Sequence, residues 1–152
     1  MSERVAQHAT FTLERDYSAA PGRVFAAWAD PVAKSRWFAG EGTTHELDFR
    51  VGGTETVLRR DSGAPELRFV AEYRDIVPQV RIVFTSSLFA EGELATVALT
   101  TVRFDAAGGG TRLVLTEQGT FLDGREAVDW REKGTGDWLD ALAVELLRPA
   151  SA

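Results

Sequence analysis

Hydrophobic and polar residues alternate along most of the chain, and this period of two predicts a protein dominated by β-strands. The first alternating segment covers residues 9–17. Six further segments are rich in Val, Thr, Leu and Phe, a composition typical of strands. They span residues 44–50, 54–60, 66–76, 80–86, 94–104 and 111–119. Short connections such as Gly52-Gly53 and Pro78-Gln79 join them, so neighbouring strands should pair antiparallel.

Two short helices are expected after the first strand. Pro21 opens the first helix, because proline is tolerated at the first helical position. Asp30 and Pro31 start the second, in which the aspartate caps free N–H groups. This second helix ends at Trp37 and Phe38, two large aromatic residues, almost directly before a glycine.

A helical period returns between about residues 125 and 148 and predicts a long closing helix. Its apolar stripe consists of Trp138, Leu139, Leu142, Ala143, Leu146 and Leu147. Gly134 and Gly136 each weaken a helix by about 1 kcal/mol relative to alanine, so the helix is either bent or begins at Thr135. In a continuous helix, Trp130 and Trp138 fall on nearly the same side, and we expect both in the core or at its rim.

The order of elements is one strand, two helices, six strands and one helix, which indicates an α+β fold. The long helix should bury its stripe against the sheet. With 152 residues the chain is expected to form a single domain over residues 1–152, with its core at about residues 10–148.

Charge and composition narrow the function. The net charge of −6 disfavours nucleic acid and anionic membranes as partners. No apolar run approaches the roughly 20 residues of a spanning helix, and the N-terminus lacks the apolar core of a signal peptide. We therefore expect a cytoplasmic location. The sequence is also compatible with a homodimer.

Several chemistries lack their residues in this chain. Cysteine is absent, which excludes disulfides, a thiol nucleophile and thiolate metal ligands. The two histidines, His8 and His45, lie far apart in sequence, so no metal site is expected. Neither a G-x-S-x-G nor a G-x-G-x-x-G motif is present, and no cofactor is predicted.

Five stretches resemble the START-like, or SRPBCC, superfamily, and within it the homologues of the activator of the ninety-kilodalton heat-shock protein ATPase. They are PGRVFAAWADP (21–31), KSRWFAG (34–40), YRDIVPQVRIVFT (73–85), GGGTRLVLTEQG (108–119) and DWLDALAVELL (137–147). One departure is Asp137-Trp138, where the family commonly has Gly-Trp. The likeness covers about residues 10–148.

The resemblance implies the helix-grip fold, in which a curved antiparallel sheet wraps around the last helix and two short helices plug one end. Trp37 and Phe38 would then lie at the rim of any cavity between sheet and helix. Two interpretations stay open: the pair seals the core, or it forms a wall that faces a ligand.

Two polar residues are candidates for chemistry at that cavity. Leu113, Leu115 and Glu117 share one face of their strand, so an inward-facing Leu115 implies an inward-facing Glu117. Without a partner such a carboxyl would be held neutral and could act as an acid or base; otherwise it reaches solvent or an arginine. Tyr73 shares the inward face of residues 66–76, where its hydroxyl either bonds within the core or meets a ligand.

Three functions remain. The first is binding of a small hydrophobic or aromatic ligand between the sheet and the C-terminal helix. Its predicted lining is Trp37, Phe38, Phe69, Tyr73, Phe84, Glu117 and Trp138. The second is a metal-free enzyme of the polyketide cyclase or hydrolase type, a role that the resemblance permits, with Glu117 and Tyr73 as catalytic candidates. The third, again implied by the resemblance, is a co-chaperone-like protein-interaction module.

Overall fold

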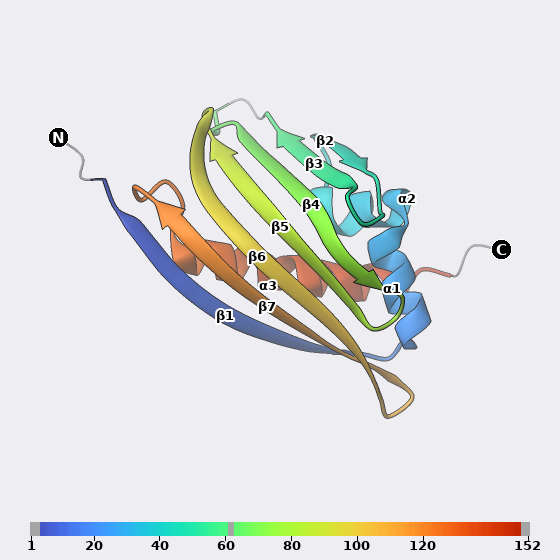
Figure 1. Cartoon of the computed structure of the whole chain (residues 1–152). Helices are drawn as coiled ribbons and strands as arrows, with labels where there is room; N and C mark the ends of the chain where they lie inside the picture. Colours follow the sequence, from blue (N-terminus) through green and yellow to red (C-terminus); the bar gives the residue numbers. More distant parts are fainter. Residues whose placement is uncertain (1–3, 61–62, 150–152) are drawn as a thin grey trace.

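One seven-stranded antiparallel sheet forms the frame of the molecule (Figure 1). The computed structural model describes residues 4–60 and 63–149. The strands are β1 (Ala6–Tyr17), β2 (Thr43–Leu47), β3 (Thr54–Arg59), β4 (Leu67–Val77), β5 (Arg81–Ala90), β6 (Glu93–Ala107) and β7 (Gly110–Leu122). Their order across the sheet is β1-β7-β6-β5-β4-β3-β2. All seven predicted strands are therefore confirmed, and the early β1 joins the last strand, β7.

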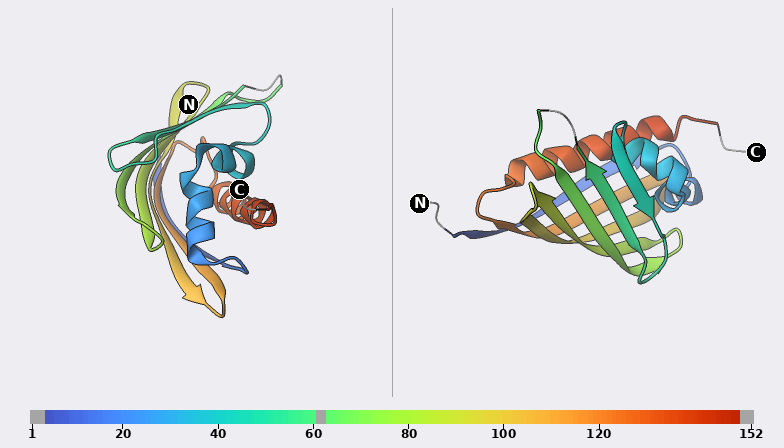
Figure 2. Two further views of the ribbon diagram at one scale, coloured as in Figure 1. Left: turned by 90° about the vertical axis from the view of Figure 1, so that its right-hand side faces the viewer. Right: turned by 90° about the horizontal axis from the view of Figure 1, so that it is seen from above.

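The helices are gathered on the concave side of this sheet (Figure 2). They are α1 (Pro21–Ala29), α2 (Pro31–Lys34), the π-helical turn η1 (Ser35–Ala39) and α3 (Val128–Glu145). The sheet curves around α3, while α1, α2 and η1 lie beside the C-terminal end of α3. This arrangement confirms the predicted α+β helix-grip fold.

The second short helix is built as its sequence predicts and then changes its winding. Asp30 accepts hydrogen bonds from the backbone N–H groups of Val32 and Ala33 and so caps α2. The chain continues into η1, whose end is set by Gly40 at a φ of 78°, a conformation that favours glycine. This turn directs Trp37 inward, where its Nε1 donates to the carbonyl oxygen of Ala27 at 2.9 Å.

The closing helix confirms part of the expected stripe and corrects the rest. Leu139 and Leu142 are buried and Leu146 is half-buried, but Ala143 and Leu147 are exposed. The helix begins at Val128 and not at Thr135. It runs through Gly136, which packs so closely that an added Cβ would lie 3.1 Å from Nη2 of Arg15.

Polar residues take the inward positions that the apolar stripe leaves open. Thr135 and Glu145 are buried on α3, and Arg131 is nearly so. The expectation for Trp130 was wrong, because this residue is 80% exposed, while Trp138 at 38% lies at the rim. At about 100° per residue, eight residues separate the two indoles by about 80° around the helix, enough to turn one of them away from the sheet.

No helix in the described part of the chain is long and apolar enough to cross a membrane.

Candidate functional site

A small cavity of about 30 Å³ lies between the sheet and α3. Six aromatic side chains contribute to its wall: Trp28, Trp37, Phe38, Phe69, Phe84 and Trp138. Phe38 stands at the centre of this group, with ring centroids 4.5 Å from Trp138, 5.5 Å from Phe69 and 5.8 Å from Trp37. The aromatic pair at the end of the second short helix thus both closes the core and lines the cavity.

One wall of the cavity is polar. Glu117 is 5% exposed and faces inward together with Leu113 and Leu115, as the parity of β7 predicted. Its Oε1 accepts a hydrogen bond from the hydroxyl of Thr100 at 2.8 Å, and its Oε2 accepts one from Nε of Arg131. Of the alternatives left open by the sequence, the structure therefore shows the one in which this carboxyl group reaches an arginine.

Arg131 extends this polar wall along α3. Its Nη1 donates to Oε1 of Glu126 at 2.9 Å, and the same oxygen accepts from the hydroxyl of Thr96 at 2.6 Å. The Arg131 side chain is 9% exposed, so a single guanidinium joins two carboxylates almost out of contact with water. Such charge-assisted bonds give Glu117 a fixed orientation toward the cavity.

Trp28, one of the residues that line the cavity, has a polar atom without a partner. Trp28 is 3% exposed, and its indole Nε1 is buried with no hydrogen-bond acceptor within the described residues. Buried donors of this kind are rare because each costs about 1–3 kcal/mol when unmatched. A ligand whose acceptor atom reaches this nitrogen would remove that cost.

A second buried polar cluster lies behind the aromatic wall. Nζ of Lys34 is 2.7 Å from Oε1 of Glu55, and the hydroxyl of Tyr73 donates to the same oxygen at 2.8 Å. Lys34 also donates to that hydroxyl at 3.2 Å. Nε2 of His45 lies 2.8 Å from Oε2 of Glu55, and because an ionised carboxylate only accepts, this nitrogen carries the proton.

The charges in this cluster depend on one another. Burial alone would raise the pKa of Glu55, but the ammonium of Lys34 and the hydrogen bonds from His45, Lys34 and Tyr73 outweigh it and hold this pKa below its ordinary value. Burial lowers the pKa of Lys34, and Glu55 opposes the effect only in part. Burial, followed by the nearby carboxylate, raises the pKa of Tyr73, so its hydroxyl remains a donor.

Aromatic rings surround the ammonium group of Lys34. The distance from Nζ to the ring centroid is 4.5 Å for Phe38 and 5.0 Å for Trp28, within the range of cation–π attraction. Both rings also contribute to the cavity wall. The cluster therefore packs behind these two rings. It also fixes the plug, which consists of α1, α2 and η1, to β3 and β4, the strands that carry Glu55 and Tyr73.

No metal site accompanies these clusters. Within residues 4–60 and 63–149, no three His, Asp or Glu side chains are grouped so that they could hold a metal ion.

Comparison with known proteins identifies the family to which the chain belongs. The sequence model of the family described as "Activator of Hsp90 ATPase homolog 1-like protein" matches residues 18–146. The chain belongs to this family. No curated protein gives a significant match.

Solved structures of similar proteins agree with membership of the Hsp90 ATPase activator homolog 1-like family. A protein from Rhizobium leguminosarum is 41% identical, with a TM-score of 0.92 over 97% of this chain and 100% of that one. Mll3558 from Rhizobium loti is 44% identical, with a TM-score of 0.88 over 93% and 99%. CV1439 from Chromobacterium violaceum is 28% identical, with a TM-score of 0.75 over 92% and 98%.

In this family member, most of the residues predicted to form the site do come together. Six of the seven lie around the cavity: Trp37, Phe38, Phe69, Phe84, Glu117 and Trp138. Tyr73 does not, because its hydroxyl is held in the cluster of Lys34 and Glu55. The two catalytic candidates, Glu117 and Tyr73, thus belong to separate networks.

Sequence reasoning missed most of the polar residues of these networks, among them the charged or ionisable side chains of Lys34, His45, Glu55 and Arg131. Glu55 could have been found by the parity that identified Glu117, since it lies two residues from Val57 on β3 and so on the same face of the strand. The pairing of His45 with Glu55 depends on the register of β2 and β3, which local sequence does not give.

Proposed function

We propose that this protein binds a small aromatic ligand that carries a hydrogen-bond acceptor, in the cavity between the sheet and α3. The observation that carries the proposal is the unmatched indole N–H of Trp28, one of six aromatic residues that line this cavity. Apolar pockets with a few fixed polar groups are the usual form of small-molecule sites. Arg131 and Glu117 supply further polar groups in the lining.

The cavity has to widen before it admits such a ligand. Its volume of about 30 Å³ is far below the roughly 300–1,000 Å³ of ordinary ligand pockets. Trp138 is the most accessible aromatic residue of the wall and packs against Phe38 with the two rings tilted by 56°. Displacement of its indole would open the cavity toward solvent without breaking the sheet.

A matched pair of probes tests the acceptor. 2-Acetylnaphthalene and 2-isopropenylnaphthalene have nearly the same shape, but only the ketone can accept the N–H of Trp28. We expect the ketone to bind more tightly by about tenfold in a fluorescence titration, the usual weight of one buried hydrogen bond. Trp28→Phe should remove this preference. Absence of saturable binding by both probes would contradict the proposal, as would an unchanged preference in Trp28→Phe.

Two tryptophans on one helix supply the test of location. Trp138→Ala removes a ring from the cavity wall and should weaken binding of 2-acetylnaphthalene several-fold. Trp130→Ala removes an indole that is 80% exposed and does not line this cavity, so affinity should stay unchanged. If the two variants weaken binding equally, the probe binds elsewhere.

The other functions inferred from sequence have less support. An enzyme that uses Glu117 and Tyr73 together would need both at one ligand, and they lie in separate networks. The family description names an activator of the Hsp90 ATPase, and for this chain a co-chaperone role remains a prediction. The single domain, homodimer and cytoplasmic location also remain predictions.

A further inference from the structure

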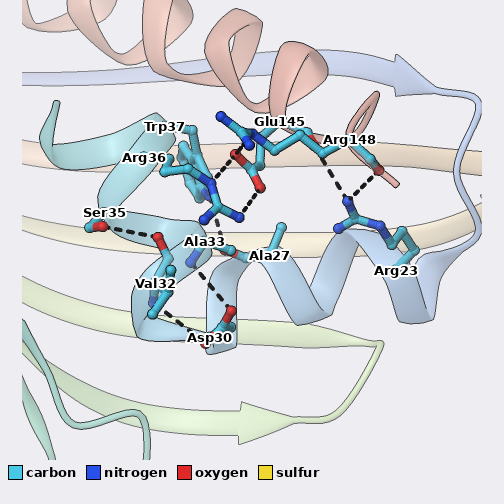
Figure 3. Close-up of polar contacts among 10 residues, drawn as sticks. All are labelled: Arg23, Ala27, Asp30, Val32, Ala33, Ser35, Arg36, Trp37, Glu145 and Arg148. Atoms are coloured by element: carbon cyan, nitrogen blue, oxygen red, sulfur yellow. Dashed lines mark hydrogen bonds and ion pairs between the residues drawn. The ribbon is translucent and has the colours of Figure 1, made fainter. Parts of the chain in front are cut away.

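A second hollow, separate from the aromatic cavity, lies where the C-terminal end of α3 meets α1 and η1 (Figure 3). Its volume is about 510 Å³. Three arginines contribute to it from different segments: Arg23 from α1, Arg36 from η1 and Arg148 from the residues that follow α3. They are far apart in sequence, and only the fold brings them to one place.

One buried carboxylate lies among these guanidinium groups. Glu145 accepts from Nε of Arg36 at 2.9 Å and from Nη2 of Arg36 at 2.7 Å, a two-pronged pair. Nε of Arg148 lies 3.3 Å from Oε1 of the same carboxylate. Arg23 instead donates from Nη2 to the backbone carbonyl oxygens of Glu145 and Arg148, at 3.4 Å each.

In this hollow the negatively charged group is buried, whereas the positively charged groups are partly exposed to solvent. The side chain of Glu145 is 4% exposed, whereas those of Arg36 and Arg148 are 38% and 60% exposed. The contacts found within residues 4–60 and 63–149 use at most two nitrogen atoms of each arginine. Each guanidinium has five N–H donors, so all three retain donors for a ligand.

The charges of the hollow do not cancel. Three guanidinium groups and the carboxylate of Glu145 contribute to it, which leaves two positive charges. Asp30 also lines the hollow, and its charge reduces this excess to one, because the amides of Val32 and Ala33 that bond its oxygens are neutral. Even with Asp30 counted, the hollow is positive in a chain whose net charge is −6.

The geometry points to a binding site for the phosphate group of a small organic phosphate in this three-arginine hollow. A phosphate monoester carries a charge of about −1.5 to −2 at pH 7, which is opposite in sign to the charge of the hollow. The planar donor fork of arginine fits phosphate oxygens. A volume of about 510 Å³ leaves room for an organic group beside the phosphate.

The test is a titration with inorganic phosphate and with phenyl phosphate at constant ionic strength, followed through the arginine Nε–H signals in ¹⁵N NMR spectra. We expect saturable shifts at Arg23, Arg36 and Arg148, with the tighter binding for phenyl phosphate. Arg148→Gln should weaken binding by about tenfold, the usual effect of losing one charge-assisted hydrogen bond. Arg112→Gln is the matched control, because this arginine on β7 is similarly exposed and paired with Asp16.

A second pair of variants leaves all three arginines in place, and here we expect tighter and not weaker binding. Glu145→Gln removes the competing charge and should tighten binding of phenyl phosphate by several-fold, with circular dichroism to check folding. Glu14→Gln changes the net charge equally at an exposed position of β1 and should have no effect. Lack of saturation overturns the proposal. Equal weakening by Arg148→Gln and Arg112→Gln also overturns it, because the attraction would then come from net charge alone.

Discussion

The ion pair of Lys34 and Glu55 illustrates how much a single residue can decide in this protein. Both side chains are 1% exposed, so each charge has lost its hydration and depends on the other. The attraction in a buried pair only about balances the cost of desolvation, whereas one charge left alone is strongly destabilising. The pair therefore specifies how the plug docks on β3 more than it adds stability.

Removing one partner should show this asymmetry. Lys34→Met leaves Glu55 buried without its ammonium, and we expect the free energy of unfolding to fall by about 3–5 kcal/mol in urea titrations. The double variant Lys34→Met/Glu55→Leu leaves no unpaired charge and should recover most of that loss. A loss below about 1 kcal/mol in the single variant would mean that His45 and Tyr73 suffice to stabilise the carboxylate.

The same pair predicts a dependence on pH. The pKa of Glu55 is lower in the folded protein than its ordinary value of 4.5. Its contribution to stability is therefore complete above about pH 4.5 and is lost as the pH falls from there through the folded-state pKa. Between pH 6 and pH 3 the wild type should lose more unfolding free energy than Lys34→Met/Glu55→Leu, which lacks the group. Parallel curves for the two proteins would contradict this assignment.

At the scale of the element, α3 is held to the sheet by a narrow line of leucines. Leu142 is fully buried, whereas Leu147 on the following turn is 80% exposed. Leu142→Ala should therefore cost about 2–5 kcal/mol of unfolding free energy, the range for a truncated core leucine. Leu147→Ala should stay within about 0.5 kcal/mol. Similar losses in both variants would show that α3 presents a different face to the sheet.

Local sequence predicted elements better than it predicted their contacts. Alternation identified every strand and the inward direction of Glu117, because side-chain direction in a strand follows from backbone geometry alone. The helical period overestimated the stripe of α3, since Arg131 and Glu145 reach inward for partners that lie far away in the chain. Those partners are Glu117 and Arg36, and only the tertiary fold brings them near.

At the scale of the whole molecule, the sheet grips the two halves of α3 unequally. The C-terminal half buries Leu139 and Leu142 and is tied to β1 by the hydroxyl of Tyr17, which donates to the carbonyl oxygen of Leu139 at 2.8 Å. The N-terminal half faces the sheet with Arg131 and Thr135 and contains two glycines. Segments with few buried apolar contacts open first, so the cavity should widen by movement of this N-terminal half.

Gly134 offers a test of that motion. An added Cβ would meet no atom within 4 Å, so Gly134→Ala should stiffen the helix without changing the cavity and stabilise the protein by about 0.5–1 kcal/mol. If the N-terminal half must open for the ligand to pass, association and dissociation of 2-acetylnaphthalene should both slow by about two- to fivefold. The affinity should hardly change if the helix is wound again once the probe has entered, because alanine then stabilises the helix equally with and without ligand. Stopped-flow fluorescence measures both rates. A more stable variant with unaltered rates would place the opening motion outside the N-terminal half of α3, at the indole of Trp138 or at the turn that carries Trp37 and Phe38.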